Sequence, residues 1–286
     1  MKQLRLFHSQ WSAPQNCDRW GFDRETRNYV DLLCAAISVE CARQNGCYIT
    51  LHTDNVGKKR YGWLPYDEVH TSLQAHKYDP VFWASGKIIA QQYEPIGAIQ
   101  IDTDVFVKTP RTVAMLAELA KNDLIVQHVE WNYQTSYNRD TWNTFINILG
   151  SLQIYGLPKF ELNPCHGYCC GIVGFNSQEL KDLYVYGYKL IYETIVNQPR
   201  FQELKKDLCC DLIAEQGWLY SAAQAMGAQV KMVLQNNDRF DADCNDYVHV
   251  INTAKYEPNV IAKCERFLQY INPTLFYQVL ERKYTF

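Results

Sequence analysis

Two carboxylates beside an apolar strand are the residues of this sequence best suited to chemistry. Asp102 and Asp104 occur in "AIQIDTDVFV", where an apolar run enters Asp-Thr-Asp and then resumes. Side chains two positions apart on an extended segment point to the same side, so both carboxylates can face one ion. Mg²⁺ and Mn²⁺ prefer oxygen ligands and often share them with substrate phosphates. The spacing predicts a metal and phosphate site, against the alternative of a plain surface turn.

Composition limits the classes of function. The chain has 286 residues, enough for one substantial core, and its 28 basic and 31 acidic residues nearly balance. There is no overall positive field of the kind that attracts nucleic acid. The sequence shows no signal peptide and no apolar run near the ~20 residues that span a bilayer. Eleven cysteines, an odd number, favour reduced thiols over a disulfide framework. We expect a cytoplasmic protein without a transmembrane segment.

Apolar periodicity predicts alternating strands and helices. Strands are expected at 4–9, 47–54, 98–102 and 123–131, and helices at 24–44, 81–93, 112–122 and over most of 199–227. This alternation indicates an α/β sheet, whose ligands gather where strands end. We expect one domain, with a nucleotide-sugar-binding half at about 1–110 and an acceptor-side half at about 111–286.

The segment "IQIDTDVFV" resembles the Asp-x-Asp strand end of GT-A-fold glycosyltransferases. Three further segments follow the chain order of the retaining transferases related to glycogenin and to bacterial galactosyltransferases. The resemblance implies a GT-A-like domain with a mostly parallel central sheet flanked by helices. It also implies transfer of a sugar from a nucleoside diphosphate donor, most often a UDP-sugar, with Mn²⁺ or Mg²⁺ as cofactor. The acceptor would be a glycan or glycolipid, with peripheral membrane contact and no nucleic-acid partner.

The most specific of these segments is "HVINTAK", His249 to Lys255. It is similar to a family pattern in which the histidine completes the metal shell and the lysine holds the diphosphate. The resemblance therefore implies a metal bound by Asp102, Asp104 and His249, with Asp102 also near the donor. Asn252 stands where the family has glycine.

Two other segments carry the resemblance toward the donor sugar. "YCCGIVGFNS" is similar to an Asn-Ala-Gly-Val strand, with Cys169 at the position of a sugar-contacting asparagine. "AEQGWL" looks like a helix start in which Glu215 and Gln216 contact the sugar and approach the reacting carbon. Asp211, one turn earlier, is an acidic alternative. A buried strand and a solvated helix face are the plain interpretations of these two segments.

The sequence gives weaker evidence for the residues that would bind the substrates. His8 or Trp11, after the first strand, could stack on a nucleobase, and Lys87 stands where family members often carry a basic donor contact. Trp131 and Tyr133 belong to a polar and aromatic segment suited to an acceptor sugar site. The alternatives are a core tryptophan, an exposed lysine and an unoccupied surface loop.

Two other functions are alternatives to transfer of a sugar. Nucleotidyl transfer also uses an Asp-x-Asp at a strand end, but it calls for a glycine-rich basic loop that the first twenty residues lack. A non-catalytic sugar-nucleotide or carbohydrate-binding protein with a degraded site is a further alternative, favoured by Cys169 and Asn252.

"DADCND" lacks the glycine of a calcium loop, and "CHGYCC" lacks a second Cys-x-x-Cys arm, so structural zinc is not expected from that motif.

Overall fold

The computed structural model describes residues 3–16, 23–131, 144, 147–149, 166–206, 209–234, 247–250 and 252–283. It contains two compact units, each assembled from separate stretches of the chain. Unit 1 comprises Met1–Ala75, Gln100–Glu118 and Phe240–Phe286, and unit 2 comprises His76–Ile99 and Leu119–Arg239. The single domain with halves meeting near residue 110 stays a prediction.

Parallel strands form the centre of unit 1. β1 (Arg5–Gln10), β2 (Tyr48–Thr53) and β3 (Glu68–His70) run parallel in this order. On the other side of β1 lies β4 (Ile99–Ile101), whose last two residues belong to this unit. The first strands predicted from the sequence are thereby confirmed, and β4 is shorter than the expected 98–102.

A short antiparallel ladder in unit 1 brings together distant parts of the chain. β5 (Val105–Val107) follows β4 after three residues and pairs with β11 (Tyr247–His249). Tyr247 lies opposite Val107, and His249 lies opposite Val105. This ladder places the C-terminal segment beside the Asp-x-Asp sequence.

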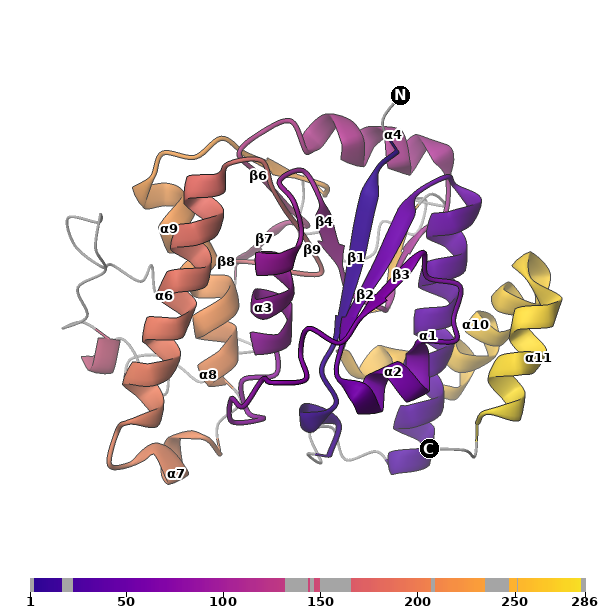
Figure 1. Ribbon diagram of the computed structural model, residues 1–286, viewed down its shortest axis with the longest axis horizontal. Coiled ribbons are helices and arrows are strands. Elements are labelled where there is room, and N and C mark those ends of the chain that lie inside the picture. Colours follow the sequence, from indigo (N-terminus) through magenta and orange to yellow (C-terminus); the bar gives the residue numbers. More distant parts are fainter. Residues whose placement is uncertain are drawn as a thin grey trace. The chain divides into compact units, whose positions relative to one another are not determined.

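Helix α1 (Arg24–Gln44) organises the core of unit 1 and coincides with the predicted helix. Asp23 caps its first turn by accepting from the Thr26 amide at 2.8 Å, and Gly46, with φ 77°, turns the chain into β2. Its apolar residues pack against α10 (Pro258–Ile271) and α11 (Pro273–Glu281), beside which it lies in Figure 1. The shorter helices of this region are α2 (Asn55–Tyr61), α4 (Pro110–Leu119), η1 (Ala13–Asn16) and η3 (Asn252–Tyr256).

Unit 2 has its own strands. β6 (Leu124–Val126) lies between β10 (Val230–Met232), which is parallel to it, and β9 (Ile172–Phe175), which is antiparallel. β7 (Val129–Trp131) pairs with β8 (His166–Tyr168) in a separate antiparallel ladder. The strand predicted at 123–131 is therefore two strands, because the chain changes its pairing partner after Val126. Taken with unit 1, these strands confirm the α/β class and the mostly parallel sheet.

The helices of unit 2 differ from the prediction in their bounds. α3 (Ser85–Tyr93) starts later than the expected residue 81. α6 (Gln178–Val196), a helix not predicted from the sequence, starts at a Ser177 cap. The segment 199–227 is divided into α7 (Phe201–Leu204), α8 (Cys209–Leu212), η2 (a π-helix, Ile213–Gly217) and α9 (Trp218–Ala225). No helix in the described part of the chain has the length and apolarity needed to cross a bilayer.

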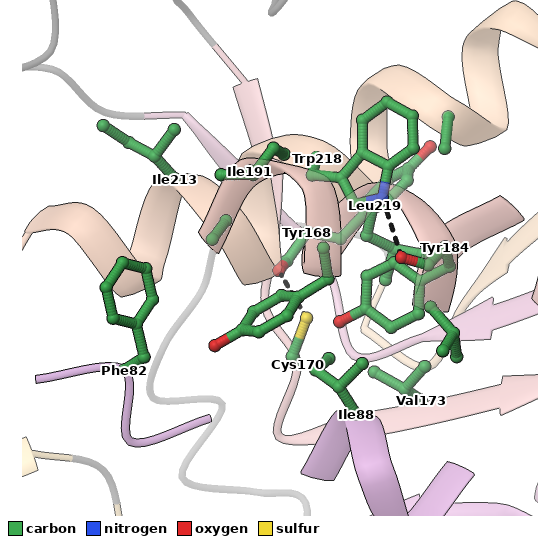
Figure 2. Packing of buried hydrophobic residues seen from close by; sticks show 14 of the residues in the cluster. Phe82, Ile88, Tyr168, Cys170, Val173, Tyr184, Ile191, Ile213, Trp218 and Leu219 are labelled. Atoms are coloured by element: carbon green, nitrogen blue, oxygen red, sulfur yellow. Dashed lines mark hydrogen bonds between the residues drawn. The ribbon is translucent and has the colours of Figure 1, made fainter. Parts of the chain in front are cut away.

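Trp218 is at the centre of the core of unit 2, and its side chain is fully buried. Its indole Nε1 donates to the Tyr184 carbonyl oxygen at 2.9 Å, the contact drawn in Figure 2. Gly187, one turn further along α6, makes room for the ring, since a Cβ there would lie 2.2 Å from Trp218 Cζ2. This packing holds η2 and α9 against α6, and so positions the Glu215 and Gln216 backbone.

Candidate metal and donor site

Asp102, Thr103 and Asp104 form a tight turn between β4 and β5. The Val105 amide donates to the Asp102 carbonyl oxygen at 2.9 Å, which closes the turn. The extended geometry predicted for this segment is therefore wrong, because the strand has already ended at Ile101. Thr103 accepts at Oγ1 from Gln10 Nε2 at 2.9 Å, so the middle residue of the turn is fixed to the end of β1.

The β5–β11 ladder brings His249 to this turn. The Val250 amide donates to the Asp104 carbonyl oxygen at 3.0 Å, and His249 Nε2 lies 3.4 Å from Asp104 Oδ1. One ligand atom each from Asp102, Asp104 and His249 lie within 4.8 Å of one another. The structure thus brings together the three residues that the sequence predicts as metal ligands. The two aspartates meet in a turn instead of on an extended strand, and the β5–β11 ladder adds the histidine.

The donor atoms of this cluster fit a hard or borderline divalent cation. Two carboxylates and an imidazole are ordinary ligands of Mn²⁺ and Mg²⁺ sites. His249 is largely buried, and its Nδ1 has no hydrogen-bond partner among the described residues. Asp102 is half-buried and accepts from Gln100 Nε2 at 3.0 Å, whereas Asp104 is buried. The cluster is therefore open on the Asp102 side.

Lys255, in η3, compensates the buried carboxylates. Its Nζ lies 3.3 Å from Asp104 Oδ2 and 3.3 Å from Asp31 Oδ1 on α1. Burial opposes the charge on both Asp104 and Lys255, but their attraction outweighs it, with help from His249 and Asp31. The pKa of Asp104 therefore lies well below its usual value and the pKa of Lys255 well above. Both groups are charged at neutral pH.

Sequence reasoning missed Asp31. The available signal was an acidic residue inside the otherwise apolar helical run "YVDLLCAA". An acidic side chain on such a face calls for a charged partner, because burial of an unpaired carboxylate is costly. Nothing in the local pattern identified that partner as Lys255.

A second group of predicted residues lies in unit 2. Lys87 Nζ, on α3, contacts Glu215 Oε1 at 3.1 Å, and the Glu215 side chain is 2% exposed. Gln216, next to it in η2, is partly exposed. π-Helical turns occur often at functional sites, because the extra residue per turn displaces side chains from regular helical positions. The ion pair between Lys87 and Glu215 was not anticipated from the sequence.

Asp211 does not fit the catalytic role considered for it. Its side chain is fully buried, and it accepts hydrogen bonds from the Tyr188 hydroxyl at 2.6 Å and from the Ala84 amide. Both carboxylate oxygens are therefore used to join α8 to α6 and to the start of α3. We correct Asp211 to a structural residue of unit 2.

The sequence profile of a protein family matches residues 1–282. The chain belongs to DUF6734, a family of unknown function. No curated protein matches the sequence of this DUF6734 protein.

Three solved structures resemble this DUF6734 protein at low identity. Mouse xyloside xylosyltransferase 1 in its apo form shares 14% identity at a TM-score of 0.37, over 81% of this chain and 85% of that one. The apo WbbM bifunctional glycosyltransferase shares 10% identity at a TM-score of 0.45, over 98% of this chain and 51% of that one. The galactosyltransferase LgtC, in complex with donor and acceptor sugar analogs, shares 13% identity at 0.36, over 83% and 74%. The chain thus spans about half the length of WbbM.

The structure contradicts the nucleobase contacts predicted for β1 and the loop after it. His8 is fully buried, with Nδ1 2.7 Å from the Tyr66 hydroxyl and Nε2 3.0 Å from Ser38 Oγ. Trp11 is 8% exposed and belongs to the core. Neither ring presents a face on which a base could stack, because alternation along β1 turns His8 inward toward α1. The nucleobase contact therefore has no assigned residue.

We expect the substitution His8→Gln to make stability less sensitive to acid. Burial lowers the pKa of His8 to about 3, and Asp104 offsets this only in part. The unfolded chain binds a proton below about pH 6.5, so the stabilisation is complete above that pH and is lost as pH falls toward the folded-state pKa. Between about pH 7.5 and pH 4.5 the wild type should lose about 2–3 kcal/mol more unfolding free energy than the variant. Urea unfolding at both pH values measures this, and parallel losses would contradict a neutral buried His8.

The acceptor-side predictions are only partly within the described residues. Trp131 ends β7, where its backbone pairs with His166, and Tyr133 lies outside the described residues, as does the "DADCND" segment. Cys169 follows β8 and is 3% exposed. The acceptor contacts of Trp131 and Tyr133 stay predictions.

Proposed function

We propose that this protein is a metal-dependent glycosyltransferase that moves a sugar from a nucleoside diphosphate donor, a UDP-sugar, to a glycan or glycolipid acceptor. The observation that carries the proposal is the convergence of Asp102, Asp104 and His249 next to a charged Lys255. Two carboxylates and an imidazole can bind the metal ion, and an ammonium group can pair with the negative charge of a diphosphate bound to that metal.

The chemistry requires charge stabilisation on the departing diphosphate. When bound, Mn²⁺ or Mg²⁺ supplies Lewis-acid stabilisation of this charge. Asp102, Asp104 and His249 would hold the metal. Lys255 lies beside Asp104 and favours its ionised form, which is the form that binds a metal ion. An ammonium group has three donors, and Asp31 and Asp104 use two of them. The third can contact a diphosphate oxygen.

For the donor sugar, we assign Gln216 in preference to Glu215. Glu215 is buried in its ion pair with Lys87, whereas Gln216 is partly exposed in the same π-helical turn. In this proposal Glu215 orients Lys87, and Gln216 contacts the sugar as the donor bond breaks. Retention of the anomeric configuration, and acceptor contacts through Trp131 and Tyr133, complete the proposal.

Thermal unfolding with a panel of nucleoside diphosphates, each with and without Mn²⁺, tests the donor assignment. Ligand at a hundredfold its dissociation constant stabilises by ~2.7 kcal/mol, which raises the midpoint of a chain of this size by about 5 °C. We expect this shift with UDP and Mn²⁺ together, and a much smaller shift with either alone. A shift with another diphosphate would correct the base, and no shift across the panel would contradict the proposal.

The product released from the nucleotide sugar distinguishes glycosyl transfer from nucleotidyl transfer and from binding without catalysis. The nucleotide sugar that stabilises the protein should release nucleoside diphosphate when a glycan acceptor is added. Release of pyrophosphate in place of nucleoside diphosphate would indicate nucleotidyl transfer instead. Binding of the nucleotide sugar without any release, across a panel of glycan and glycolipid acceptors, would favour the non-catalytic binding protein.

A further inference from the structure

A second cluster of potential metal ligands lies in unit 2 and shares no residue with the Asp102 cluster. His128, Glu130 and Cys169 each offer one ligand atom, and these three atoms lie within 4.8 Å of one another. His128 and Cys169 are 5% and 3% exposed, and Glu130 is half-buried. We propose that these three side chains bind a Zn²⁺ ion.

The β7–β8 ladder explains why these side chains meet. Val129 lies opposite Tyr168, so His128 lies opposite Cys169, and the Cys169 amide donates to the His128 carbonyl oxygen at 2.9 Å. Directly opposite residues of an antiparallel pair share a face. His128 immediately precedes β7 and is two positions from Glu130 on that strand, so these two side chains share a face as well. Glu130 lies opposite Gly167, where a Cβ would lie 3.3 Å from Gln216 Cβ, so η2 packs against this face of the ladder.

The chemical types of the three ligands indicate which metal ion this cluster would bind. A thiolate and an imidazole together favour Zn²⁺ over the Mg²⁺ or Mn²⁺ that suits the Asp102 cluster. Bonds of about 2.0–2.3 Å in a tetrahedral site place ligand atoms about 3.3–3.8 Å apart, which is within side-chain adjustment of the observed cluster. With three ligands from the described residues, one position can be taken by water or by a further ligand.

Cys169 then has a ligand role that its own sequence motif does not predict. The sequence motif "CHGYCC" offers no second Cys-x-x-Cys arm, and for that reason structural zinc was not expected. The ladder supplies the missing ligands from a different strand, where periodicity in the sequence gives no sign of them. A zinc ion here would join the segment after β6 to the segment before β9, which adds a cross-link between two short strands.

Cobalt titration of the metal-free full-length protein tests the proposal. Co²⁺ replaces Zn²⁺ in such sites, and a bound thiolate gives a sulfur-to-cobalt charge-transfer band that a site of carboxylates and imidazole cannot give. We expect Co²⁺ to develop this band and Zn²⁺ to remove it, with saturation at one equivalent of Co²⁺ in Asp104→Asn, where the Asp102 cluster competes less for the ion. Cys169→Ser should abolish the band and weaken Zn²⁺ binding by about 100-fold or more.

Matched variants make the result specific. Cys170→Ser removes the neighbouring thiol, which donates to the Tyr168 carbonyl oxygen and is outside the cluster, and it should keep the band. Glu130→Gln should keep the band but weaken Zn²⁺ binding about tenfold or more, and it serves if Cys169→Ser does not fold. Asp104→Asn should leave the band unchanged, which separates this site from the proposed donor site. Absence of the band in the wild type, or its persistence in Cys169→Ser, would overturn the proposal.

Discussion

Replacing Asp104 by asparagine is expected to lower release of nucleoside diphosphate from the donor by roughly 10²–10⁴-fold. Asparagine keeps the shape of the side chain but removes the charge that a divalent cation requires. The backbone contacts of Asp104 in the turn and in the β5–β11 ladder are unchanged by the substitution. Initial rates at saturating donor and Mn²⁺ measure the loss, and calorimetric Mn²⁺ titration should show a parallel loss of affinity.

Asp31→Asn is the matched control for this experiment. Asp31 and Asp104 lie at the same 3.3 Å distance from Lys255 Nζ, but only Asp104 belongs to the metal cluster. Loss of one partly exposed pair is worth about 0–1 kcal/mol, so the control should stay within about fivefold of wild type in rate and in Mn²⁺ affinity. Equal losses in the two variants would mean that Asp104 acts through Lys255 rather than as a metal ligand.

Lys255→Met is expected to destabilise unit 1 by about 3–5 kcal/mol and to abolish nucleotide-dependent stabilisation. The Lys255 side chain is 18% exposed, and its ammonium group lies between two acidic side chains. Its removal leaves Asp31 and Asp104 without their shared cation, and an uncompensated buried charge is costly. Urea unfolding in metal-free buffer measures the change in unfolding free energy.

Mn²⁺ offers an internal check on this second prediction. Because the cation can replace part of the lost positive charge, Mn²⁺ should raise the stability of Lys255→Met more than that of the wild type. Lys58→Met, at an exposed position in α2, is the control and should change stability by less than about 0.5 kcal/mol. A loss below about 1 kcal/mol in Lys255→Met would show that the carboxylates do not depend on this lysine.

The parts of the fold that follow from local pattern were predictable. The 3.6-residue periodicity predicted α1 over its whole length, and short apolar runs predicted β1 and β2. The strand at 123–131 was misjudged because a continuous apolar run does not show where pairing changes partner. The π-helical turn at Ile213–Gly217 likewise has no distinct sequence signal.

The candidate site was predictable in its ligands but not in its surroundings. Residue type and spacing predicted Asp102 and Asp104, and the resemblance to GT-A-fold glycosyltransferases implied His249 and Lys255; the structure brings all four together. The Asp31 contact, the burial of His8 and the Lys87–Glu215 pair depend on long-range packing, which no local window of sequence contains. The same holds for the His128 and Cys169 pair.

The β5–β11 ladder also determines when this cluster can form. Lys255 and Asp104 are 151 positions apart in the chain, and such long-range contacts form late because loop-closure entropy must first be overcome. During synthesis, which proceeds from the N-terminus, the two aspartates of the turn emerge long before His249 and Lys255. A nascent chain therefore carries both carboxylates but neither the imidazole nor the ammonium group. The proposed metal site is therefore complete only when the C-terminal segment has been made and docked.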